Sequence, residues 1–384
     1  MLTILNKHQP LRTILLSWMV LVAGIAAAQE RPAWPYSPKW LQPFWLDDVM
    51  EGESVLFIRD SASEAARGSV LFPIQEIVSV RSSSGETTYE QGIDYRFEPG
   101  SREIIIPVGS RIVTTPSSEL RRPANSQRHR LTHRDGNGEI LFGATLEYHQ
   151  MQTQVTYKKA NNEWPVPMAT FDRAALPVTL KKLSNREPVS IVLLGDSIST
   201  GCNASAWGNG APFHPAYQDL LVQHLEAHYD TQVTLTNLSV GGTSTPWGIS
   251  KIEEVAKHKP DLVILAFGMN DSAGHSAQTY GKNTATMIAN TRTLLPKAEF
   301  ILVASMLGNR DWITLNHDVF PHYRDELAAL CAPGIALADM TSVWNEFLKR
   351  KQDADLTGNG VNHPNDFGHR VYAQVLSTLL IDPQ

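Results

Sequence analysis

The stretch VSIVLLGDSIST, residues 189 to 200, decides how the second half of the chain is interpreted. Its first seven residues are mostly apolar and rich in β-branched side chains, which is typical of a strand buried on both faces of a parallel sheet. A Gly-Asp-Ser turn follows directly and contains Ser197. A serine exposed where a strand gives way to a helix can act as a nucleophile once a histidine activates it. Taken alone, the same three residues also fit an ordinary turn.

Four more apolar stretches follow at intervals that leave room for helices: QVTLTNLSV (232–240), PDLVILAFG (260–268), EFILVASM (299–306) and GIALADM (334–340). The sequence between them is helical in pattern, over residues 216–229, 245–258, 280–295 and 322–331, and a last helix follows HPND. This alternation predicts an α/β fold with a parallel sheet covered by helices on both faces. Ligands of such sheets bind beyond the carboxyl ends of the strands, so the residues after each strand are the candidates for function.

Three of these positions carry residues that suit acyl transfer. The second strand is followed by Gly241 and Gly242, where an unshielded backbone N–H can approach a ligand. The third is followed by Asn270, whose amide can donate to a developing oxyanion. His363 lies before the final helix and is a candidate base. Each has an ordinary alternative (a tight turn, a helix cap, a structural histidine), but together with Ser197 they supply every part that acyl transfer requires.

In these four blocks, GDSIS, SVGGT, GMND and NHP, the chain resembles the SGNH (GDSL-type) hydrolases over residues about 185–384. The resemblance implies a flavodoxin-like three-layer α/β/α fold and ester hydrolysis with no cofactor and no metal. It implies Ser197 and His363 as catalytic residues. It also implies an oxyanion hole made by the Ser197 N–H, a glycine N–H and the Asn270 side chain. The glycine is carried over to Gly242, with Gly241 as the alternative.

One position departs from the family pattern. Many members have Asp-x-x-His in the last block, whereas this chain has Gly360 three residues before His363. The acid of such a triad fixes the tautomer of the ring and stabilises the imidazolium. Three alternatives follow: Asp355 folds back to the ring, a backbone carbonyl accepts from it, or the site is inactive.

The first half of the chain has a different pattern. Residues 29–50 are rich in Pro and Trp and predict an extended lead-in. From 51 to 165, short runs rich in Val, Ile and Phe alternate with turn residues and predict strands, one of them EILFGATLEY (139–148). This pattern predicts a small β-sandwich-like accessory domain before the catalytic domain of residues 185–384. The role of this β-rich domain is open at this stage.

Residues 1–28 predict a signal peptide. Basic residues, a short apolar run and three alanines follow one another there, and the run is shorter than a membrane span needs. We therefore expect export to the periplasm or the medium without stable membrane insertion. The formal net charge of −6 argues against nucleic acid as a partner. Cys202 and Cys331 are expected to be free thiols.

The functional expectation is an exported serine ester hydrolase that removes acetyl or another small acyl group from a carbohydrate, most simply a polysaccharide. Two alternatives accompany it. One is an acyl hydrolase of the lysophospholipase or thioesterase kind. The other, motivated by Gly360, is a carbohydrate-binding protein whose hydrolase half is degenerate. The acyl group, the alcohol and the oligomeric state are left open by the sequence.

Overall fold

The structure, a computed structural model, describes residues 34–126, 130–143 and 145–382. The predicted signal peptide lies outside these ranges. Residues Ala33–Gln384 group into one compact unit, so the predicted division of this part into an accessory and a catalytic domain stays a prediction. None of the helices in the described ranges is long and apolar enough to cross a membrane.

The parallel sheet has five strands, each within one of the apolar stretches that predict it. They are β13 (Val189–Gly195), β14 (Val233–Asn237), β15 (Leu262–Ala266), β16 (Glu299–Ala304) and β17 (Ile335–Asp339). Their order is β14-β13-β15-β16-β17, and every neighbouring pair is parallel. Of these five strands, β13 comes first in the sequence, and it lies between the second, β14, and the third, β15. This is the strand order of flavodoxin-like folds.

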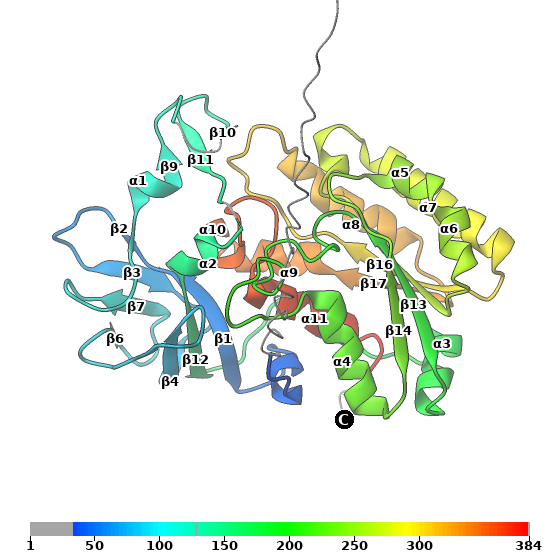
Figure 1. The fold of residues 1–384 in the computed structure, drawn as a ribbon, viewed down its shortest axis with the longest axis horizontal. Helices are drawn as coiled ribbons and strands as arrows, with labels where there is room; N and C mark the ends of the chain where they lie inside the picture. The colour runs from blue at the N-terminus through cyan, green and yellow to red at the C-terminus, as the bar shows by residue number, and fades with distance from the viewer. Residues whose placement is uncertain (1–33, 127–129, 144, 383–384) are drawn as a thin grey trace, which may run out of the picture. The chain divides into compact units, whose positions relative to one another are not determined.

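Helices cover both faces of this sheet (Figure 1). Successive strand residues point to opposite faces, so Ile191 and Leu193 join one buried cluster while Val192 and Leu194 join another. The first cluster includes residues of α3 (Pro177–Ser184), α4 (Tyr217–Tyr229), α9 (Met340–Phe347) and α11 (Asp366–Ser377). The second includes residues of α6 (Ile252–Lys257), α7 (Ala277–Leu294) and α8 (Phe320–Ala329), with α5 (Thr245–Ser250) packed against it. The predicted three-layer α/β/α fold is confirmed.

The described residues of the β-rich half form three small sheets. One has the order β1 (Val49–Leu56), β12 (Gln152–Lys159), β4 (Ile74–Ser82) and β5 (Thr88–Tyr89). A second has the order β6 (Arg96–Phe97), β7 (Glu103–Ile106), β3 (Ala66–Ser69), β2 (Ile58–Arg59) and β8 (Thr115–Pro116). The third has the order β10 (Arg130–Thr132), β11 (Glu139–Leu141) and β9 (Arg121–Arg122). Val80 and Val155 of the first sheet share a buried cluster with Ile104 and Ile106 of the second, as the two sheets of a sandwich do.

Three local predictions differ from the structure. The single helix predicted over 245–258 is two short helices, α5 and α6, that meet at Lys251. The strand predicted over 139–148 ends at Leu141, and α2 (Glu147–Met151) follows it. The lead-in contains a 3-10 turn, η1 (Pro38–Leu41), and β1 already begins at Val49.

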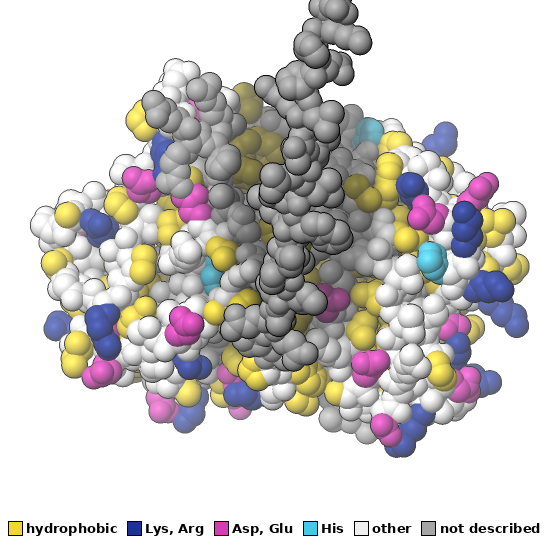
Figure 2. Space-filling model, viewed as in Figure 1, with side chains coloured by type: hydrophobic (Ala, Val, Ile, Leu, Met, Phe, Trp, Pro, Cys, Tyr) yellow, Lys and Arg dark blue, Asp and Glu magenta, His cyan; other side chains and the backbone are white. Residues whose placement is uncertain are grey.

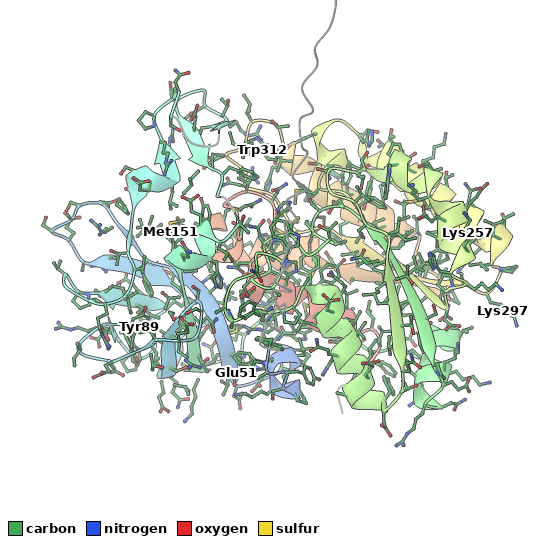
Figure 3. All side chains as sticks on the ribbon, viewed as in Figure 1. Glu51, Tyr89, Met151, Lys257, Lys297 and Trp312 are labelled. Atoms are coloured by element: carbon green, nitrogen blue, oxygen red, sulfur yellow. The ribbon has the colours of Figure 1, made fainter. Side chains whose placement is uncertain are left out.

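Buried polar contacts join the two halves. Lys351, next to α10 (Asp353–Leu356), forms an ion pair with Glu53 of β1 at 2.7 Å, and both side chains are fully buried. Arg370 of α11 donates to the carbonyl O of Gly52. A further contact between the halves involves Trp312, which lies near the β10–β11 hairpin (Figure 3) and forms an isolated antiparallel β-bridge with His133. The β-rich half is thus tied to the loops at one edge of the α/β half.

Candidate active site

Ser197 lies in the tight turn that follows β13. Gly195 ends the strand, and a Cβ on it would lie 2.5 Å from the carbonyl O of Ala266, so a side chain there would push neighbouring strands apart. Asp196 is buried and its Oδ1 accepts the Ile198 N–H at 3.0 Å, which braces the turn. Burial raises the pKa of Asp196 to about 7. The turn thereby holds Ser197 at the carboxyl edge of the sheet, as predicted.

The structure brings His363 to Ser197 across 166 residues of sequence, with Nε2 2.9 Å from Oγ. Asn359 organises the turn before it, because its Oδ1 accepts the N–H groups of Val361, Asn362 and His363. The residue is partly buried, and burial lowers the pKa of its ring to about 4 because the cation loses its hydration. The ring is therefore neutral at pH 7 and can accept a proton.

Asn203 contacts the other ring nitrogen, and sequence reasoning missed it. Its Oδ1 lies 2.8 Å from Nδ1 of His363. Asn203 is only 7% exposed and has a left-handed backbone, with φ at 65°. The sequence signal was weak, because it is only an asparagine six residues after Ser197 in a turn-rich stretch. Asparagine tolerates the left-handed backbone conformation better than most residues do.

Asp355 lies elsewhere. Its Oδ1 accepts the N–H of Leu56 at 2.7 Å and its Oδ2 accepts that of Gln352 at 2.9 Å. The carboxylate therefore joins β1 to α10, and the structure does not bring it to the ring of His363. A backbone carbonyl, the other alternative, does not take that place either, because the side chain of Asn203 does.

Gly360 is a glycine for a steric reason. Its φ is 79°, and a Cβ there would collide with the hydroxyl of Tyr148 and lie 2.7 Å from the carbonyl O of Leu141. Both neighbours belong to the β-rich half. An aspartate at this position, as in the family pattern, would have no room.

The predicted oxyanion donors lie in the loops that follow β13, β14 and β15 at the carboxyl edge of the sheet. The Nδ2 of Asn270 donates to the carbonyl O of Thr243 at 2.9 Å, which uses one of its two N–H groups and leaves the other. Gly241 lies beside the nucleophile, since a Cβ on it would be 3.6 Å from Cβ of Ser197, while Gly242 has a φ of 78° and open space around it. In the ranges that the structure covers, the N–H groups of Ser197 and Gly242 donate no hydrogen bond. The oxyanion roles of these groups stay predictions.

The arrangement supplies a hydroxyl and a neutral ring that can take its proton. Cys202 lies five residues after Ser197, and its sulfur contacts the Thr200 hydroxyl. Both cysteines are free, as predicted. Within the described part of the chain, no three His, Cys, Asp or Glu side chains are placed to hold a metal ion.

The part of the chain that contains the site is similar to a known protein family. Residues 193–371 match the model of the GDSL-like Lipase/Acylhydrolase family. The arylesterase of Vibrio mimicus is 30% identical over 101 residues, which are 26% of this chain and 46% of that protein. The chain therefore spans about half the length of this curated relative.

Solved structures with a similar fold include two esterases. One is a mutant of an acetyl-xylooligosaccharide esterase from Geobacillus Stearmophilus, at 21% identity and a TM-score of 0.41, over 49% of this chain and 92% of that one. The other is a two-domain esterase active on acetylated mannans, at 20% identity and a TM-score of 0.44, over 54% of this chain and 52% of that one.

Proposed function

Residues 193–371 belong to the GDSL-like lipase/acylhydrolase family, and from this premise we propose that the protein is a serine carboxylic-ester hydrolase. One observation carries the proposal. Oγ of Ser197 and Nε2 of His363 lie 2.9 Å apart, a distance at which the hydroxyl donates to the ring nitrogen. A nucleophile in contact with its base is the central requirement of acyl transfer.

The mechanism follows from these positions. Oγ of Ser197 attacks the ester carbonyl carbon as Nε2 of His363 takes the hydroxyl proton. The oxyanion that forms is stabilised by the N–H groups of Ser197 and Gly242 and by the free N–H of Asn270. The imidazolium then gives its proton to the leaving alcohol. Water, activated by the same ring, hydrolyses the acyl-serine and restores the enzyme.

For the substrate we propose a small acyl group, acetyl in the first place, on a carbohydrate. A cavity of about 130 Å³ is lined in part by the indoles of Trp34 and Trp40 and by His214 and Asp366. Oδ2 of Asp366 and Nε2 of His214 are buried, and neither has a hydrogen-bond partner in the described part of the chain. Acceptors beside aromatic rings suit a ligand rich in hydroxyl groups.

One residue that lines this cavity, Asp366, is close in sequence to the catalytic site and is hydrogen-bonded to a residue near Asn203. Asp366 follows His363 by three residues, and its Oδ1 accepts the N–H of Ser205, two residues beyond Asn203. Basic and acidic side chains are interspersed on the face that Figure 2 shows, which offers no broad basic surface there for nucleic acid. The sequence of residues 1–28 supports action after export.

The lysophospholipase or thioesterase alternative predicts a preference for long acyl chains, and the degenerate-site alternative predicts no turnover at all. The test is acetate release from a panel of acetylated polysaccharides, with hydrolysis of a small aryl acetate measured in parallel. Ser197→Ala should abolish both activities, with kcat lower by roughly 10⁴-fold or more.

Ser199→Ala is the matched control, because the Ser199 hydroxyl contacts the buried hydroxyl of Tyr217 and not His363. It should keep kcat within about tenfold of the wild type. Activity on the aryl ester alone would keep the chemistry and reject the carbohydrate. No activity on either ester, or turnover that survives in Ser197→Ala, would reject the proposed function.

A further inference from the structure

The side chain of Asn203 makes three hydrogen bonds, and together they use both amide hydrogens and the oxygen. Nδ2 lies 3.1 Å from the carbonyl O of Thr145 and 3.0 Å from that of Gly358. Oδ1 lies 2.8 Å from Nδ1 of His363. Because carbonyl oxygens only accept, Nδ2 must face the two carbonyls and Oδ1 must face the ring. The surroundings therefore fix the orientation of the amide.

The amide in turn fixes the tautomer of His363. Oδ1 accepts and cannot donate, so Nδ1 of the ring carries the proton. The lone pair of the neutral imidazole is then on Nε2, which faces the Ser197 hydroxyl. We propose that Asn203 is the positioning residue of the catalytic histidine, replacing the acid of the Asp-x-x-His pattern, and that this position requires an amide. The inference rests on the ester hydrolysis proposed above.

A carboxylate would not serve at position 203. Its second oxygen would face the carbonyl oxygens of Thr145 and Gly358 with no hydrogen to share. A buried charge would then lie against two acceptors, and only one oxygen could accept from the ring. An aspartate there either moves away from the two carbonyls or takes up a proton, and in both cases it loses its hold on the ring.

The two carbonyls are themselves held in place by packing. Gly358 is so close to Asn203 that a Cβ on it would lie 2.5 Å from Cβ of Asn203, and its N–H donates to the carbonyl O of His363. Thr145 belongs to the segment that precedes α2, where the Gly143 N–H donates to the carbonyl O of Asn359 at 3.0 Å. The β-rich half therefore supplies one of the two acceptors that orient the amide, and the base is incompletely positioned without it.

The test uses the full-length protein and two variants, Asn203→Ala and Asn203→Asp, with kcat and KM measured on an aryl acetate. Asn203→Ala should lower kcat by about 10²–10⁴-fold, since removal of the acid that orients a triad histidine costs about 10⁴-fold, and it should change KM by less than about threefold. Asn203→Asp should also lower kcat, by at least about tenfold. Asn283→Ala is the matched control, because its partly buried amide donates to Oγ1 of Thr245 and makes no bond to His363. It should keep the wild-type kcat.

A second readout reports the tautomer directly. The ¹⁵N chemical shifts of the His363 ring should show a protonated Nδ1 and an unprotonated Nε2 in the wild type at pH 7. In Asn203→Ala the two tautomers should become mixed, a change that a merely structural role would not produce.

Three results would overturn the inference: a wild-type ring protonated on Nε2, an Asn203→Ala variant with wild-type kcat and tautomer, or an Asn203→Asp variant at least as active as the wild type. A wild-type protein inert on every ester would instead reject the proposed function. The ring shifts would still decide the role of Asn203 in that case.

Discussion

The α/β half and the β-rich half contribute to the site in different ways. In the proposed mechanism the α/β half supplies the reacting groups, and each comes from a short block at the end of a strand or before α11. The β-rich half supplies no reacting atom in the proposed mechanism. Its Thr145 carbonyl nevertheless orients Asn203, and its Tyr148 fills the space that a side chain at position 360 would occupy. The types of the reacting side chains can thus be read from short stretches of sequence, whereas the orientation of these side chains depends on contacts between distant segments.

Among the further substitutions that compare the two halves, the largest effect on kcat is expected inside the α/β half. Asn270→Ala removes an oxyanion donor and should lower kcat by about 10²–10³-fold, with little change in KM, because the lost interaction forms in the transition state. Steady-state kinetics on an aryl acetate provide the measurement. An unchanged kcat would remove Asn270 from the oxyanion hole and leave the Ser197 and glycine N–H groups as the donors.

A substitution at the boundary tests the contribution of the β-rich half. Gly360→Asp restores the acid of the family pattern, but it forces a side chain against Tyr148 at a positive φ. We expect the free energy of unfolding to fall by about 2–4 kcal/mol and the activity to decrease. Denaturant unfolding and kcat are the two measurements. A gain in activity at unchanged stability would show that the site needs an acid after all.

A substitution of Asp355 tests the contact between the two halves without removing a hydrogen bond of His363. Asp355→Ala removes the acceptor of the Leu56 and Gln352 N–H groups and should lower the free energy of unfolding by about 1–3 kcal/mol. The kcat measured below the melting temperature should stay close to that of the wild type. A loss of kcat comparable to that of Asn203→Ala would return Asp355 to the catalytic mechanism.

The smallest effect concerns pH. Burial lowers the pKa of His363 to about 4, so the ring stays neutral, and able to accept a proton, until the pH approaches that value. We expect kcat/KM to change less than about twofold between pH 7 and pH 5 and to fall only as the pH drops through about 4. An acid limb near pH 6.5 would mean that the ring is as well hydrated as a free histidine.

The lowered pKa of His363 also makes the stability of the folded protein depend on pH. His363 in the unfolded chain takes up a proton near pH 6.5, whereas in the folded state it does so near pH 4. Between these values the unfolded state binds more protons, so stability decreases as the pH falls. Melting temperatures measured across this range separate lost folding from lost catalysis.

Much of the fold could be predicted from the sequence because parallel strands buried on both faces leave an unmistakable apolar pattern. The five strands of the α/β half were found in this way. The β-rich half was harder, because several of its strands have only two to four residues. The segment 139–148 has the apolar pattern of one strand, although β11 ends at Leu141 and α2 begins at Glu147. A short apolar run does not distinguish a strand from the first turn of a helix.

The sequence by itself determined the sheet, its edge and the types of residue that meet there, because hydrophobic periodicity and the residue after each strand are local properties. Only the tertiary structure decided what orients His363. Asn203 is 160 residues away from the histidine it contacts. Its amide faces the ring because two carbonyls, one from each half of the molecule, accept its hydrogens. A hydrogen-bond geometry assembled from three distant segments leaves no periodic trace in the sequence, and packing alone brings it together.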